Sequence, residues 1–315
     1  MATRPPSPAR AGLVLLGLVA LLAPGCKSSP SANPEFDDAA RYLVRVFDSG
    51  TDAERAFGMR ALEEQVYLNI DLEASSAANR SVEPAQIEEE DVADLERPSR
   101  DLDRNMPVAV GVLSAYPPDE LARVIVLTDQ VPVEPSSQGD DGQYVRTLLD
   151  GGDCWLDGGC DALRTHNLVT RSNILYTVTY DLWKDYRWVD MALPDPAEVP
   201  EGEEAVNEGE PRQAILVRSW MKESASSEGG TITIWQSFAM EIMAPRDCAG
   251  FVRDGSEDNR DDGSWQTDSC GGGSVRMQAM WSETEIGVDD DVQLSATRTG
   301  MSDGMEAYDD WLEEH

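Results

Sequence analysis

Two cysteines and a histidine lie close enough along the chain to suggest nucleophilic chemistry. Cys154 and Cys160 belong to the segment GGDCWLDGGCDALRTHN, residues 151–167, which also contains His166. A cysteine attacks as a thiolate, which a neighbouring imidazole can generate. The glycine pairs of this segment make tight turns easy, so the two sulfurs can also reach disulfide distance. Because a disulfide removes the thiolate, we expect a Cys154–Cys160 bridge here, with a Cys160–His166 pair as the alternative.

The other residue types that could do chemistry give no specific signal. The chain has 60 acidic residues, and paired carboxylates can act as acid and base in a hydrolase. With so many acids almost any pair can be drawn, so the sequence singles out none. It contains no H-E-x-x-H, G-x-S-x-G, P-loop or G-x-G-x-x-G pattern. We therefore predict no catalytic residue, no cofactor and no metal ion, and keep a carboxylate hydrolase as the alternative function.

A second cysteine pair encloses a loop rich in aspartate and glycine. Cys248 and Cys270 flank GFVRDGSEDNRDDGSWQTDS, residues 250–269, whose oxygens would suit calcium. An EF-hand register that starts at Asp258 fails, because Arg260 and Ser269 then occupy ligand positions. We expect solvated turns closed by a Cys248–Cys270 disulfide, with calcium binding as the alternative. Four cysteines allow three pairings, and the short separations favour the two local ones.

Cys26 is the fifth cysteine and ends a distinctive N-terminal segment. Arg4 and Arg10 precede the apolar run 13–22, LVLLGLVALL, which is followed by APGC, residues 23–26. A basic start, a short apolar centre and small residues at its end are typical of a secretory signal. In a helix this run rises about 15 Å, which is half of a bilayer core. An odd cysteine count is unusual in an exported chain, and setting Cys26 aside leaves four that can pair.

This N-terminus resembles that of bacterial lipoprotein precursors, in which a lipidated cysteine becomes the first mature residue. Gly25 and Cys26 match the pattern, whereas Ala23 and Pro24 depart from it. The resemblance implies a signal peptide over residues 1–25, a lipid on Cys26 and a cell-envelope location. By analogy with Gram-negative lipoproteins, Lys27 implies sorting to the outer membrane. Residues 26–34 are rich in serine and proline and suit a flexible tether. The alternative is an ordinary cleaved signal with an incidental cysteine.

The charge of the chain excludes some classes of partner. Lysine and arginine number 25 against 60 acidic residues, for a formal net charge of −35. Such a surface repels nucleic acid and anionic headgroups, so the membrane contact is expected through the lipid on Cys26 alone. Lysine occurs only at positions 27, 184 and 222. Acidity with few lysines also fits solubility in a salty habitat, which we favour over cation binding.

Hydrophobic periodicity predicts one α+β domain over residues 35–315. Helices are expected at 35–48 and from a capping box at Thr51 to about Gln65, followed by a strand from Val66 to Leu72. Acidic loops are expected at 74–105, with a short helix after Pro84, and at 194–212. A last helix is expected over 302–314. Further strands are predicted at 106–116, 123–128, 173–182, 186–193, 213–223, 231–243, 274–286 and 292–299. The strand at 186–193 is expected either to pair with the strand at 173–182 or to continue it.

Two N-terminal helices, a long twisted antiparallel sheet and a C-terminal helix define the expected fold class. A sheet of this kind can curl around the terminal helix, as in a half-barrel or the START-like helix-grip folds, and leave an apolar cavity. The helix-grip order begins with a strand, whereas here two helices come first. We therefore predict a non-enzymatic envelope lipoprotein that binds an apolar ligand or an envelope protein.

Overall fold

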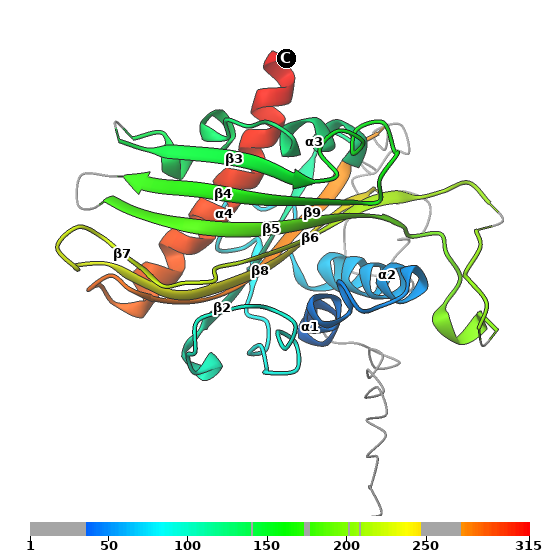
Figure 1. Ribbon diagram of the computed structural model, residues 1–315, viewed down its shortest axis with the longest axis horizontal. Coiled ribbons are helices and arrows are strands. Elements are labelled where there is room, and N and C mark those ends of the chain that lie inside the picture. Colours follow the sequence, from blue (N-terminus) through cyan, green and yellow to red (C-terminus); the bar gives the residue numbers. More distant parts are fainter. Residues whose placement is uncertain (1–35, 140, 173–176, 201, 208, 247–271) are drawn as a thin grey trace, which may run out of the picture.

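The computed structural model describes residues 36–315 apart from 140, 173–176, 201, 208 and 247–271 (Figure 1). It opens with the two expected helices, α1 (Phe36–Val46) and α2 (Asp52–Asn69). The predicted capping box starts α2: the Glu54 amide donates to Thr51 Oγ1 at 3.2 Å, and the Thr51 amide donates to Glu54 Oε2 at 2.6 Å. Both orphan amides at the start of the helix are thereby satisfied.

The strand predicted at Val66–Leu72 is wrong, because α2 continues through Asn69. Val66 and Ile70 are buried, while Leu68 between them is 50% exposed. A pattern that alternates over so few residues fits either period, since positions four apart also share one face of a helix. The helical period is the one that the chain adopts, because α2 packs against α1.

Nine strands of the described chain form one antiparallel sheet in the order β1-β2-β9-β8-β6-β5-β4-β3, with β7 paired to β8. The fold class is therefore α+β, as predicted. The strands are β1 (Ser81–Val82), β2 (Met106–Ser114), β3 (Gln143–Asp150), β4 (Ala162–Ser172), β5 (Thr177–Asp190), β6 (Gln213–Trp220), β7 (Ala225–Ser226), β8 (Thr233–Pro245) and β9 (Ser274–Glu285). The strand predicted at 186–193 is the continuation of β5, not a separate partner.

Three other predicted elements need correction. Residues 118–125 form the helix α3 (Pro118–Ile125), which overlaps the strand predicted at 123–128. Pro118 suits the first turn of a helix, and Leu121, Val124 and Ile125 are buried together. The strand predicted at 292–299 belongs to the long helix α4 (Asp290–Glu314). The described residues that directly follow Pro84 form no helix. Strands β3 and β4, which flank the cysteine loop, were not predicted.

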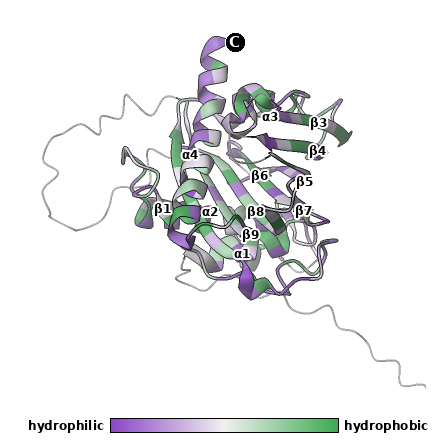
Figure 2. Ribbon diagram, turned by 90° about the vertical axis from the view of Figure 1, so that its left-hand side faces the viewer, coloured by the Kyte–Doolittle hydropathy of each residue, from purple (hydrophilic) through white to green (hydrophobic). Residues whose placement is uncertain are grey.

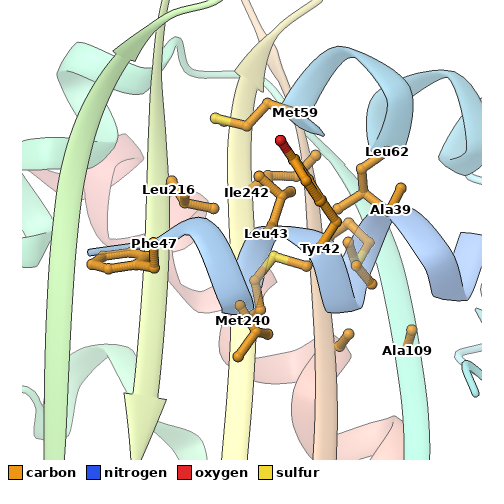
Figure 3. Packing of buried hydrophobic residues seen from close by; sticks show 14 of the residues in the cluster. Ala39, Tyr42, Leu43, Phe47, Met59, Leu62, Ala109, Leu216, Met240 and Ile242 are labelled. Atoms are coloured by element: carbon orange, nitrogen blue, oxygen red, sulfur yellow. The ribbon is translucent and has the colours of Figure 1, made fainter. Parts of the chain in front are cut away.

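The helices cover opposite faces of the sheet. Figure 1 shows α1 and α2 in front of the strands and α4 behind them. The larger core lies on the α1 and α2 side, where Leu43, Phe47 and Met59 pack on Leu216 and Met240 (Figure 3). From β2 onward the order is a strand, the helix α3, further strands and the long helix α4. The segment from β2 to α4 thus has the helix-grip order of elements, and α1 and α2 precede this segment as a separate layer.

The acidic segment 74–105 is largely irregular but is tied down by its charges. Asp91 is fully buried and accepts from Arg41 Nε at 2.8 Å and Arg45 Nε at 3.0 Å. The acidic run 88–91 therefore anchors this loop to α1 and is not merely solvated. Short 3-10 turns lie in this and other connections: η1 (Leu102–Arg104), η2 (Val131–Val133), η3 (Pro135–Ser137) and η4 (Pro196–Glu198).

Candidate functional site

The first candidate site lies between the sheet and α4. We call the α4-facing side chains of the sheet and the sheet-facing side chains of α4 the interlayer. Direct cross-strand neighbours share one face of a sheet. By this register Lys184 on β5, Ser219 on β6, Ala239 on β8 and Met280 on β9 form one row. Met280 packs against the cluster that contains Met301 and Met305 of α4, so the row faces α4. Figure 2 shows α4 running along this face.

Several side chains at the centre of the interlayer are incompletely buried. Helix α4 packs chiefly on β2 at one rim and on α3, η2 and η3 at the other. On the central strands, Leu182, Lys184, Gln278 and Met280 are only half-buried although they lie between two layers. Close-packed side chains between a helix and a sheet are normally fully buried. Water therefore reaches the middle of this face.

A cluster of cationic and phenolic side chains lies at one end of the interlayer. Arg146 on β3 lies 5.7 Å from the ring of Tyr144 and 5.6 Å from the ring of Tyr186. The ammonium of Lys184 lies 5.9 Å from the Tyr144 ring. We call these four residues, Tyr144, Arg146, Lys184 and Tyr186, the cationic cluster. Strands β3, β4 and β5 position it, because alternate residues of neighbouring strands project to the same side.

Part of the cationic cluster has an evident structural role. Arg146 Nε donates to Asn167 Oδ1 at 2.7 Å, and Nη1 donates to the carbonyl of Ile125 at the end of α3. The guanidinium thus closes the last turn of that helix, where carbonyl groups lack partners. The Nη2 atom is buried without a well-aligned hydrogen-bond acceptor, and the phenolic groups of Tyr186, Tyr144 and Tyr308 lie near the guanidinium.

The protonation states of the cluster follow from its surroundings. Burial raises the pKa of Tyr186 to about 12, although Arg146 and Lys184 act to lower it. Burial alone would lower the pKa of Lys184, but its phenolic neighbours outweigh burial and the net shift is upward. The pKa of Arg146 is raised in the same way, with burial outweighed by Tyr186 and Tyr144. At neutral pH Arg146 and Lys184 are therefore cations and the Tyr186 hydroxyl is neutral, and all three can donate hydrogen bonds.

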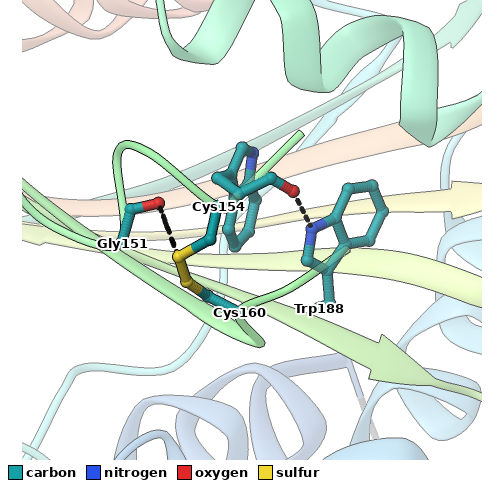
Figure 4. The surroundings of a disulfide bond; sticks show 5 residues. Gly151, Cys154, Cys160 and Trp188 are labelled. Atoms are coloured by element: carbon teal, nitrogen blue, oxygen red, sulfur yellow. Dashed lines mark hydrogen bonds between the residues drawn. A yellow bond between two sulfur atoms is a disulfide. The ribbon is translucent and has the colours of Figure 1, made fainter. Parts of the chain in front are cut away.

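The predicted Cys154–Cys160 disulfide is present, with the two Cα atoms 5.4 Å apart. Cys154 Sγ lies 3.5 Å from the Gly151 carbonyl, and Trp188 Nε1 donates to the Trp155 carbonyl at 3.4 Å (Figure 4). The loop thereby holds the fully buried Trp155 against Trp188. The bridge removes the thiolate, so the Cys160–His166 alternative is not supported. The Cys248–Cys270 pair and the calcium loop lie outside the described residues, as does Cys26.

His166 lies apart from the cysteines, on β4. Its Nε2 atom is 2.6 Å from Asp181 Oδ1, and its ring packs on Trp183 at 5.0 Å between centroids. Both partners are on the face of the sheet away from α4. The pair is a surface contact, remote from the cationic cluster.

The carboxylates that come together do not form an acid–base pair. Asp185 and Asp48 both contact Arg218, at 3.5 and 2.6 Å, and Asp185 also accepts two hydrogen bonds of 2.7 Å from Arg164. Burial raises the pKa of Asp48, but Arg218 and Arg187 outweigh it, so the net shift is downward. A general acid needs a raised pKa to hold its proton at neutral pH. This network therefore gives no support to the carboxylate hydrolase.

Three further features of the described part of the chain bear on function. It contains no group of three or more side chains suited to a metal ion. None of its helices has the length and apolar character needed to cross a membrane. A cleft of about 720 Å³ lies between η3 and the first half of α4, and its α4 lining does not include the sheet-facing Leu294, Met301 and Met305. Its lining is mostly small residues and includes neither cationic nor aromatic side chains.

The cationic cluster was not predicted from the sequence, although one signal was present. Lys184 is one of three lysines and lies between the predicted strands 173–182 and 186–193, where it alternates with Tyr180, Leu182, Tyr186 and Trp188. A lysine on the apolar face of a strand is unusual, because buried charges need partners. Arg146 gave no such signal, since β3 itself was not predicted.

Comparison with known proteins assigns no family. No protein-family model matches the sequence, and no curated protein matches it. Among solved structures, TTHA0849 from Thermus thermophilus is 11% identical, with a TM-score of 0.33 over 66% of this chain and 94% of that one. Ara h 8.0201 is 12% identical, with a TM-score of 0.30 over 67% of this chain and 99% of that one.

Proposed function

We propose that this chain is an exported lipoprotein, anchored through Cys26, whose sheet-and-helix domain binds an apolar ligand in the interlayer. The observation that carries the binding role is the incomplete burial of Leu182, Gln278 and Met280 between α4 and the sheet. Ligand sites in proteins are typically apolar with a few convergent polar groups. The apolar side chains of this face and the cationic cluster at its end have that composition.

The anchoring role rests on the N-terminal sequence. The apolar run 13–22 leads to Cys26, and Phe36, the first residue of α1, follows ten positions later. Ten residues reach at most about 35 Å when fully extended. A lipid on Cys26 would therefore hold the binding domain close to the membrane surface, where apolar molecules are released and taken up.

Replacing Cys26 tests the anchor. In a Gram-negative host that processes lipoproteins, the unaltered protein is expected in the membrane fraction after a high-salt wash. Cys26→Ser is expected to move it to the soluble periplasmic fraction, because a covalent lipid is the one membrane contact left to so acidic a chain. The double variant Cys154→Ser/Cys160→Ser should remain with the membrane. If Cys26→Ser is still membrane-bound after the wash, the anchor proposal is wrong.

A further inference from the structure

Charge pairing in this protein has an exception inside the interlayer. Elsewhere its buried arginines have carboxylate partners: Arg218 contacts Asp48, and Arg276 donates to Glu241 at 2.6 Å. Arg146 and Lys184 have no carboxylate partner among the described residues. In a chain with 60 acidic and 25 basic residues, two adjacent cations without an acid are unexpected. A fully buried charge such as that of Arg146 is ordinarily paired, because an unpaired charge in an apolar setting is costly, whereas Lys184 is only half-buried.

The same cluster holds several unused polar atoms. Arg146 Nη2 and the hydroxyls of Tyr144 and Tyr186 are buried and make no hydrogen bond. These three residues are at most 3% exposed. The Lys184 ammonium lies 5.9 Å from the Tyr144 ring, and Tyr186 and Tyr308 are also close enough to interact with it. Buried polar atoms nearly always have partners, so their clustering here requires an explanation.

Two simpler explanations account for only part of this arrangement. Closing the last turn of α3 explains Arg146 Nε and Nη1 but leaves Nη2 and Lys184 unexplained. Ordered water would satisfy the two hydroxyls, but water does not neutralise two positive charges. An oxyanion does both, since it accepts hydrogen bonds from all four groups and carries the opposite charge.

We propose that the ligand of the interlayer is an amphiphile with an oxyanion head, held by Arg146, Lys184, Tyr144 and Tyr186. This inference rests on the proposed ligand-binding function and specifies its chemistry. The apolar body of the molecule lies along Leu182 and Met280, toward Leu294 of α4. The acidic outer surface then does not oppose binding, because the head contacts the cations and the rest of the ligand is uncharged.

A matched pair of probes tests the proposal on the Cys26→Ser protein. The probes are 11-(dansylamino)undecanoic acid and its methyl ester, which share one apolar body and differ in the head charge. Dansyl fluorescence gives Kd for each. The acid is expected to bind roughly 10- to 100-fold more tightly than the ester, which is the range for hydrogen bonds to charged groups.

Variants then assign the discrimination to the cluster. Lys184→Met is expected to weaken binding of the acid by roughly tenfold or more and to leave the ester unchanged. The double variant Tyr144→Phe/Tyr186→Phe removes two hydroxyls without changing shape and should act in the same direction. Lys222→Met is the matched control, because Lys222 contacts Glu96 and Trp183 on the other face of the sheet.

The possible outcomes separate this inference from the proposed function. If acid and ester bind equally and Lys184→Met affects neither, the oxyanion head is wrong while ligand binding stands. If neither probe binds, the proposed function itself is contradicted. Competition with dodecanoate, dodecyl phosphate and inorganic phosphate identifies the head. Displacement by either amphiphile supports the proposal, and displacement by inorganic phosphate at the same concentration as the amphiphiles would overturn it in favour of a free-anion site.

Discussion

At the scale of residues, Arg218 holds together segments that are far apart in sequence. Its guanidinium is 2.6 Å from Asp48 after α1, 2.8 Å from Asp94 in the acidic loop and 3.5 Å from Asp185 on β5. It also lies over the ring of Phe47, 4.6 Å from the centroid. Arg218 is 1% exposed and the side chain of Asp185 is 6% exposed, whereas the side chains of Asp48 and Asp94 are 38% and 39% exposed. Loss of the guanidinium would leave the Asp185 carboxylate buried, whereas the carboxylates of Asp48 and Asp94 could be hydrated.

Arg218→Met is therefore expected to lower the free energy of unfolding by about 1–3 kcal/mol, less than the cost of a fully buried ion pair because two of the three carboxylates are partly exposed. Urea unfolding followed by tryptophan fluorescence measures the change. Arg123→Met is the control, since Arg123 pairs with Glu120 on the exposed surface of α3 at 2.6 Å. Its loss should cost less than about 1 kcal/mol. Equal effects of the two substitutions would contradict a structural role for the Arg218 contacts.

At the scale of elements, two helical glycines show how packing overrides helix propensity. A Cβ on Gly58 of α2 would lie 2.8 Å from Leu43 Cδ2 and 2.9 Å from Tyr42 Cδ1, both on α1. A Cβ on Gly304 of α4 would meet nothing within 4 Å. Glycine is intrinsically poor in helices, so only Gly58 has a packing reason to be there. It allows α1 and α2 to approach closely over the larger core.

Alanine at these two positions is thus expected to have opposite effects. Gly304→Ala should raise the free energy of unfolding by about 0.5–1 kcal/mol, because it reduces the freedom of the unfolded chain. Gly58→Ala should lower it by about 1–3 kcal/mol, because the added methyl group overpacks the contact between helices. Thermal and urea unfolding of both variants check the signs. Stabilisation by Gly58→Ala would show that α1 and α2 are less closely packed than the structure indicates.

At the scale of the whole molecule, the dominant feature is a net charge of −35. Like charges repel and oppose compaction, and salt screens them over about 10 Å at 0.1 M. We expect the melting temperature of the Cys26→Ser protein to rise between roughly 10 mM and 500 mM NaCl, by about 2–4 °C for each kcal/mol gained. KCl at the same ionic strength is the control and should act equally. A fall with salt would mean that ion pairs outweigh the repulsion.

The same titration with CaCl2 at matched ionic strength addresses the calcium alternative. General screening predicts equal rises for the two salts. A larger rise with calcium would indicate a specific cation site, because ligands that bind only the folded state stabilise it.

Several features of this protein were determined by local sequence and were predicted from it. The capping residues Thr51 and Glu54 start α2 through contacts three residues apart, and the glycine-rich spacing of Cys154 and Cys160 permits their bridge. Helical and strand periods placed most strands and indicated the α+β class. Export and lipid attachment at Cys26 also rest on local sequence and remain predictions.

Other features were decided only by tertiary structure. Residues 66–69 and 292–299 fit two periods, and packing against α1 and the sheet made both helical. The cationic cluster joins Arg146 of β3 to Lys184 of β5, which are brought together by register across β4. No short-range sequence pattern predicts that Arg146 and Lys184 lie close together, because their proximity depends on which strands pair. The absence of a carboxylate beside these two cations, among the residues that the structure describes, is likewise a property of the folded chain, and the proposed ligand chemistry depends on it.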